Sequence, residues 1–266
     1  MKDNILLKRL TVFLAPALLV VIWEIWLGQP LAIVEAFCLT ILVIALAIWY
    51  LTLRPLAVSQ LQSSFHRREF WRFSLSPLFF VVAIFGFLVI LESTWWQQVL
   101  VWLSAVVILA TLQNLFDRFY RGASYSARSF EIISNNINTL SIFVLTTVLY
   151  SLIVFLNWAV YVVAILLLAC CILLFYQSMW IAGLKLGQSW LFILIDSLVM
   201  IELFWVLNFL PNTFYIKALV LTVVYYSVIN LSRNWLLKIL QPEMIKRYLI
   251  VSLSILVLVL ATAQWM

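Results

Sequence analysis

The sequence predicts an all-α, polytopic transmembrane helical bundle of about nine spans, with a cytoplasmic N-terminus and an external C-terminus. Hydrophobic residues make up 67% of the chain and charged residues 10%, whereas soluble domains carry about 25% charged residues. Apolar runs recur along the whole chain, each close to the roughly 20 residues that a spanning helix needs. Fifteen of the sixteen Lys and Arg residues fall in alternate connections between these runs, and such an excess marks the cytoplasmic side.

Taken in order, the apolar runs predict nine spans within one integral membrane domain, 1–266: 10–27, 31–53, 75–92, 97–116, 137–156, 158–179, 189–209, 213–232 and 247–264. The first run follows Lys8 and Arg9 as a signal peptide would, but no small-residue cleavage site follows it. We therefore expect a retained span. Pro16 should kink it, because a proline inside a helix removes one backbone hydrogen bond.

The connections between the runs alternate in character. The N-terminal segment and the second, fourth, sixth and eighth connections hold the basic residues: Lys2, Lys8, Arg9, Arg54, Arg67, Arg68, Arg72, Arg118, Arg121, Arg128, Lys185, Arg233, Lys238, Lys246 and Arg247. The other connections are tight, hold no Lys or Arg, and should join the spans into hairpins: Gly28–Pro30, Ser93–Trp96, Asn157 and Pro211–Asn212. The net charge of +6 is thus a topology signal, and it does not indicate a nucleic-acid partner.

The sequence lacks the residues that several kinds of catalytic and metal-binding site require. Cys38, Cys170 and Cys171 all lie inside apolar runs and have no metal-ligand spacing. His66 is the only histidine, so no histidine-based metal cluster or catalytic triad is available. No phosphate-binding glycine loop occurs either. The sequence therefore indicates no catalytic residue, no metal ligand and no cofactor.

Five charged residues inside the runs are the candidate ligand-binding residues: Glu24, Glu35, Asp196, Glu202 and Lys217. Each costs about 2.5–3.5 kcal/mol or more within a membrane, so each calls for an explanation. Residues equidistant from a tight turn lie at equal depth in a helical hairpin. This rule places Glu202 level with Lys217, where the two can form an ion pair. The pair either belongs to a ligand-binding site or only fixes the register of the two helices in the hairpin.

The same rule places Glu24 level with Glu35, near the predicted external face. Two carboxylates at one depth repel unless they share a proton, bind a cation or point apart. We expect an acidic, outward-opening polar pocket here; the alternative is that each side chain reaches water separately.

Asp196 lies near the middle of the seventh run, within reach of Thr222, Tyr225 or Tyr226 on the eighth. An intramembrane carboxylate predicts a functional site, and a buried structural hydrogen bond is the competing interpretation.

Basic residues in the cytoplasmic loops are candidates for binding lipid headgroups: Arg67, Arg68, Arg72, Arg118, Arg121 and Arg128. Each basic residue contributes about 1 kcal/mol against an anionic leaflet. An ordinary solvated loop is the alternative. Membrane lipids and other membrane proteins are accordingly the expected partners.

The stretch Asn208–Tyr215, followed by Lys217–Leu219 and Tyr225–Tyr226, resembles a family of polytopic membrane proteins of unknown function from candidate-phylum bacteria. The resemblance covers one hairpin. It implies a bacterial inner (plasma) membrane, and it carries no activity.

Three functions remain open on the sequence. The leading hypothesis is non-enzymatic binding or transport of a small solute or lipid through a polar pocket on the outer side. The alternatives are a membrane enzyme that acts on lipid-linked substrates and a scaffold subunit of a membrane complex. Missing catalytic motifs weigh against the enzyme, and scarce glycine weighs against alternating access.

Overall fold

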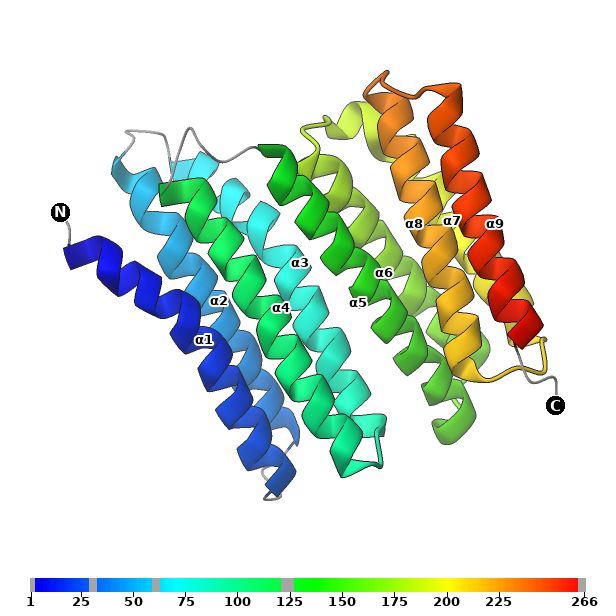
Figure 1. Ribbon diagram of the computed structural model, residues 1–266, viewed down its shortest axis with the longest axis horizontal. Helices are drawn as coiled ribbons and strands as arrows, with labels where there is room; N and C mark the ends of the chain where they lie inside the picture. The colour runs from blue at the N-terminus through cyan, green and yellow to red at the C-terminus, as the bar shows by residue number, and fades with distance from the viewer. Residues whose placement is uncertain (1–2, 29–32, 59–62, 121–126, 263–266) are drawn as a thin grey trace. The chain divides into compact units, whose positions relative to one another are not determined.

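The computed structural model describes residues 3–28, 33–58, 63–120 and 127–262, and over these residues the chain is built of helices without strands (Figure 1). The helices are α1 (Asp3–Gly28), α2 (Ile33–Val58), α3 (Ser63–Ile90), α4 (Thr94–Tyr120), α5 (Ala127–Leu156), α6 (Val160–Ile181), α7 (Leu186–Asn208), α8 (Phe214–Leu236) and α9 (Pro242–Thr262). The predicted all-α class is confirmed.

Eight of these helices, α1 to α8, are long and apolar enough over their described residues to cross a membrane. This confirms the prediction of a multi-pass membrane protein. The helix α9 carries the ninth predicted span as far as Thr262, and its crossing stays a prediction. The helices α3 and α5 begin before the predicted starts at 75 and 137, because a helix continues through polar residues that a search for apolar runs leaves out.

Three of the described helices, α5, α6 and α8, are followed by a residue with a left-handed backbone. Asn157 (φ 54°) follows α5, Gly183 (φ 81°) follows α6 and Lys238 (φ 58°) follows α8. After α6, the Leu184 N–H donates to the Met179 carbonyl at 3.1 Å, the bond that closes a helix with a left-handed residue after its C-cap. Of these three residues, Asn157 lies in one of the predicted hairpin turns, and Gly183 and Lys238 lie in the basic connections.

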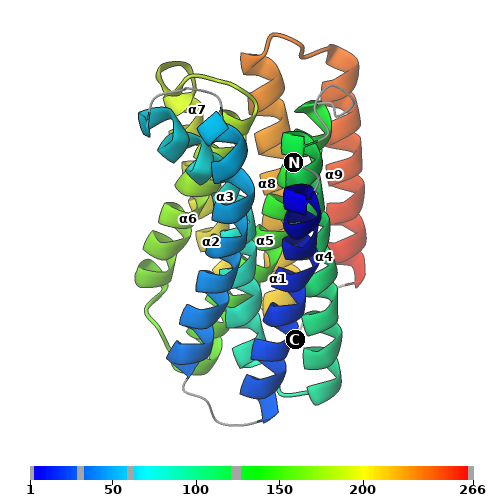
Figure 2. The same cartoon turned by 90° about the vertical axis from the view of Figure 1, so that its left-hand side faces the viewer.

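Contacts divide the chain within α5 into two compact units, Met1–Ile137 and Asn138–Met266. In the first unit α2 packs against α1, α3 and α4, and α4 also packs against α1 and α3. In the second unit α7 packs between α6 and α8, α6 also touches α8, and α9 packs on α8 alone. In each unit, three helices therefore contact one another in pairs: α2, α3 and α4 in the first unit (Figure 2), and α6, α7 and α8 in the second.

Each unit has two kinds of helix end. We call the end at the short connections Leu91–Ser93, Asn157–Ala159 and Phe209–Thr213 the turn end, and the opposite end, with Lys185 and Arg233, the basic end. Large apolar side chains are exposed along the flanks between the ends, with Trp102 60% and Val106 62% exposed. Such apolar flanks are what a bilayer covers.

Candidate functional site

The helix α8 positions the candidate site. It packs against α6, α7 and α9, and it is the least apolar of the eight spans. Its buried face carries polar residues at several levels: Thr222, Tyr225, Ser227, Asn230, Ser232 and Asn234. A polar helix in the middle of a membrane unit brings its polar groups to its neighbours, where they must find partners.

Asp196 of α7 is the carboxylate that one of these polar groups, Ser232, contacts directly. Its side chain is 4% exposed, and the Ser232 hydroxyl donates to its Oδ1 at 3.0 Å. Its second oxygen, Oδ2, is buried and has no hydrogen-bond partner. Asp196 lies ten residues from the start of α7 at Leu186, or about 15 Å at 1.5 Å per residue. The free oxygen therefore lies near the middle of the span.

Tyr225 of α8 lies seven residues from Ser232 on the same helix, about 10 Å farther toward the turn end. It is fully buried, and its ring packs on Phe175 with the centroids 4.8 Å apart. Its hydroxyl has no hydrogen-bond partner. It lies close to Ser178 and interacts electrostatically with Asp196. A second unsatisfied polar atom thus lies near the carboxylate.

Asn138 of α5 extends the cluster to a fourth helix. Its Nδ2 donates to the Ser178 hydroxyl at 3.1 Å, and its Oδ1 is buried with no hydrogen-bond partner. We call Asn138, Ser178, Asp196, Tyr225 and Ser232 the Asp196 centre. It joins four helices of the second unit. Most buried polar atoms in proteins are hydrogen-bonded, so three unsatisfied atoms in one cluster call for a ligand.

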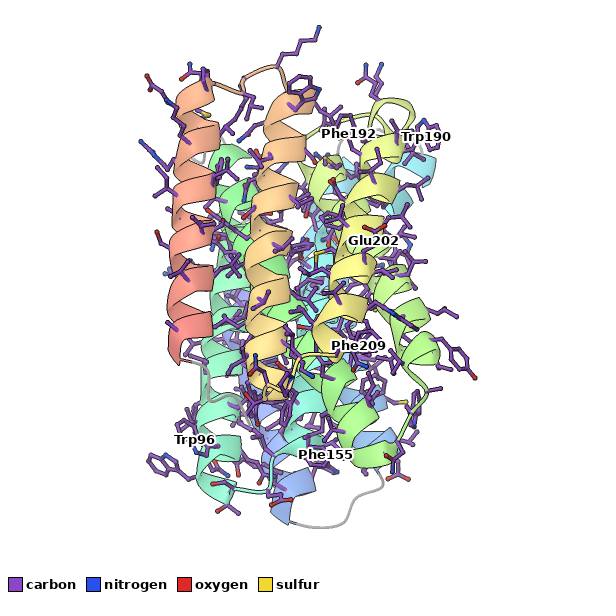
Figure 3. All side chains as sticks on the ribbon, turned by 90° about the vertical axis from the view of Figure 1, so that its right-hand side faces the viewer. Trp96, Phe155, Trp190, Phe192, Glu202 and Phe209 are labelled. Carbon is purple, nitrogen blue, oxygen red and sulfur yellow. The ribbon has the colours of Figure 1, made fainter. Side chains whose placement is uncertain are left out.

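The expected ion pair between Glu202 and Lys217 is wrong. The Lys217 ammonium contacts the Asn208 carbonyl at 3.4 Å and lies over the Tyr150 ring, 5.8 Å from its centroid. Glu202 is exposed, and Figure 3 shows it on the flank of α7 between Trp190 and Phe209.

The error comes from rotation about the helix axis. Glu202 is two residues from Met200 and from Phe204, both fully buried. At about 100° per residue, two residues turn a side chain to the opposite face of a helix.

The expected pairing of Glu24 with Glu35 is also wrong. Glu24 is half-buried and accepts a hydrogen bond from Gln98 Nε2 of α4 at 2.9 Å. Glu35 is exposed in the first turn of α2. The packing of α1 on α4, which the hairpin rule does not predict, gives Glu24 this partner.

Of the six candidate headgroup residues, two have described side chains. The Arg118 guanidinium lies 4.9 Å from the Phe73 ring and 5.0 Å from the Phe130 ring, and that of Arg72 lies 5.9 Å from Phe73. Arg121 lies outside the described residues, and so do the side chains of Arg67, Arg68 and Arg128. Lipid binding by these residues stays a prediction.

The sequence analysis missed Asn138, Ser178 and Ser232. A signal for Ser232 was available, because it follows Tyr225 by seven residues and therefore shares its helix face. Asn138 and Ser178 were not singled out, because each has polar neighbours in its helix, such as Asn135 and Gln177, and the sequence does not show which of them faces α7.

The chain matches no family model, no curated protein and no solved structure. The case for a functional site therefore rests on the geometry of the Asp196 centre. Its chemistry is that of an acceptor-rich site: a carboxylate oxygen, an amide oxygen and a phenol hydroxyl, all buried.

Proposed function

We propose that this multi-pass membrane protein is not an enzyme but binds and transports a small cationic solute that donates hydrogen bonds. Asp196 is the binding group. The observation that carries the proposal is the buried Asp196 Oδ2, which has no hydrogen-bond partner. Intramembrane carboxylates mark substrate and ion pathways more often than other positions.

The chemistry of the centre selects the class of solute. A buried acceptor left unsatisfied costs about 1–3 kcal/mol, and more when it is charged. A small ammonium-type solute would donate to Asp196 Oδ2 and neutralise the carboxylate in one step. The unsatisfied Asn138 Oδ1 and Tyr225 hydroxyl supply further acceptors for its other donors.

Polar residues favour access from the basic end. Between the Asp196 centre and that end lie the buried side chains of Ser189 and Asn234. Toward the turn end, the second unit is filled by Tyr150 and Phe204, whose rings stack 4.6 Å apart. The hydroxyls of Thr146 and Thr147 bond to carbonyls of their own helix, so the turn-end half has fewer groups for a polar solute.

The sequence hypothesis of an outer-side pocket needs four side chains that come together at the turn end. Glu35 and Glu202 are exposed, and Glu24 and Lys217 are engaged with Gln98 and Asn208. The same transport function is therefore better supported at Asp196.

The test uses the full chain in proteoliposomes with ammonium and methylammonium as probes. We expect both probes to raise the unfolding temperature and to drive a transport current. Asp196→Asn should weaken probe binding at least tenfold, because it removes the negative charge with little change in volume. The matched control Glu202→Gln removes an exposed carboxylate and should bind the probes as the parent does.

A further probe separates charge from hydrogen bonding. Tetramethylammonium has the charge but no donor, and it should give neither response. Equal binding of the probes by the parent and the Asp196→Asn variant, or no response of the parent to either probe, would overturn the proposal.

A further inference from the structure

The flank of α7 carries a carboxylate in an otherwise apolar stripe. Exposed residues recur along this helix at alternating spacings of four and three: Leu191, Ile195, Leu198, Glu202, Trp205 and Phe209. We call these six residues the α7 seam. Leu198 is 54% exposed and Phe209 is 74% exposed, so the stripe is open both above and below Glu202 (Figure 3).

Lipid alone leaves Glu202 unsatisfied. It lies six residues from the end of α7 at Asn208, about 9 Å along the helix. Trp205 and Phe209 cover the seam between it and the turn end. A charged side chain facing hydrocarbon costs about 2.5–3.5 kcal/mol or more. Within the described spans Lys217 is the cation nearest in depth, and it is engaged with Asn208 and Tyr150.

We propose that the α7 seam is a dimer interface, in which it packs against the same seam of a second copy. Most homo-oligomers have a two-fold axis, and each residue on such an axis meets its own copy. An axis along the membrane normal keeps both Glu202 side chains at one depth. Mutual repulsion and burial favour the protonated form of two facing carboxyls, and protonated carboxyls hydrogen-bond to each other, so each gives the other the partner that lipid does not supply.

The spacing of the residues in the α7 seam supports the pairing of two α7 helices, one from each copy. Alternating steps of four and three keep one stripe facing a partner helix along a left-handed crossing. A single polar residue within such a stripe fixes register and oligomeric state, and polar side chains hold membrane helices together. Glu202 is the one polar member of the α7 seam, and it lies within the stripe with two members on its turn-end side.

The test is disulfide cross-linking of the full chain in liposomes. The native thiols Cys38, Cys170 and Cys171 are first replaced by alanine. One cysteine is then introduced at Leu198 or, as the matched control, at Val199. These neighbours differ little in depth, are both exposed, and point about 100° apart. We expect Leu198→Cys to form a disulfide-linked dimer at least tenfold faster than Val199→Cys.

Substitutions at Glu202 separate its role from that of the apolar seam. In the Leu198→Cys background, Glu202→Gln should retain the dimer, because paired amides also hydrogen-bond across the axis. Glu202→Leu should reduce cross-linking at least tenfold. Equal cross-linking at 198 and 199, a monomer at all lipid ratios, or full cross-linking with Glu202→Leu would each overturn the interface. Asp196 takes no part in this test, so its outcome is independent of the solute proposal.

Discussion

The two units share an order of helix neighbours but contain buried polar groups that differ in hydrogen bonding. In the first unit the Trp23 indole donates to Thr40 Oγ1 at 3.0 Å. Ser76 and Ser134 are hydrogen-bonded at 2.7 Å. In the second unit Asp196 Oδ2 and the Tyr225 hydroxyl lie near mid-span without a hydrogen-bond partner.

Under the proposed function, the difference separates polar groups that hold helices together from polar groups that a bound solute would satisfy. A satisfied hydrogen bond between membrane helices stabilises them by about 0.6–2 kcal/mol. An unsatisfied one destabilises the fold by about 1–3 kcal/mol, a cost that can be retained where activity needs it. If this comparison is right, substitutions should have opposite effects on stability in the two units.

The largest expected effect is in the first unit, at Trp23. Its side chain is fully buried and hydrogen-bonded to Thr40. Trp23→Ala should lower the free energy of unfolding by about 3–5 kcal/mol, since it leaves a cavity and removes the donor to the Thr40 hydroxyl, which still donates to the Ala36 carbonyl at 2.6 Å. Unfolding in mixed micelles by titration with denaturing detergent measures the change.

The matched control for Trp23 is Trp102 in the same unit, which is 60% exposed. Trp102→Ala removes the same side chain from a lipid-facing position and should cost less than about 1 kcal/mol, because no cavity forms. Similar losses for the two variants would contradict the account of the first unit as a packed, satisfied core.

At Asp196 in the second unit, we expect a substitution to raise the free energy of unfolding, not to lower it. Asp196→Leu replaces a buried, half-satisfied carboxyl by an apolar side chain, and should raise the free energy of unfolding by about 1 kcal/mol. Ser232, which loses its acceptor, can bond to a carbonyl of its own helix as Ser227 does to Val223. The measurement is the same unfolding titration, without added ammonium salts.

A substitution at Thr40 in the first unit is the counterpart of Asp196→Leu in the second. Thr40→Val keeps the shape of the side chain but removes the acceptor of the Trp23 indole, and it should cost about 1–3 kcal/mol. A stabilising Thr40→Val or a destabilising Asp196→Leu would break the contrast between the units.

The span positions follow from the sequence because the membrane imposes a simple rule on length and composition. An apolar run of about 20 residues has few alternatives to a spanning helix, and α6 to α8 begin within three residues of their predicted starts. Helix extensions beyond the apolar runs, such as the start of α3 at Ser63, obey no such rule.

The candidate site follows from the sequence only in part. Asp196 stands out because a carboxylate in mid-span is rare. Its partner Ser232 depends on the rotation and register of α7 against α8. Apolar residues on every face of a membrane helix leave rotation undetermined, and for this reason the equal-depth rule paired Glu202 with Lys217 incorrectly.

The smallest expected effect tests the comparison within the second unit, between two tyrosines. Tyr150 and Tyr225 are 1% and 0% exposed. Their rings pack on Phe204 and Phe175 at 4.6 Å and 4.8 Å. The Tyr150 hydroxyl donates to the Phe204 carbonyl at 3.1 Å, whereas that of Tyr225 has no hydrogen-bond partner. The two differ chiefly in this one bond.

Phenylalanine at each position therefore isolates the hydroxyl. Tyr150→Phe should lower the free energy of unfolding by about 0.6–1 kcal/mol, the usual worth of a hydrogen bond between membrane helices. Tyr225→Phe should leave it unchanged within about 0.5 kcal/mol, because no bond is lost and one unsatisfied polar group is removed. With ammonium bound, the ranking of the two variants by stability should reverse. The Tyr225→Phe variant should gain less stability from the probe than the Tyr150→Phe variant does. Equal losses for the two variants without a probe would mean that the Tyr225 hydroxyl is already satisfied, and the Asp196 centre would then lose one of its three free groups.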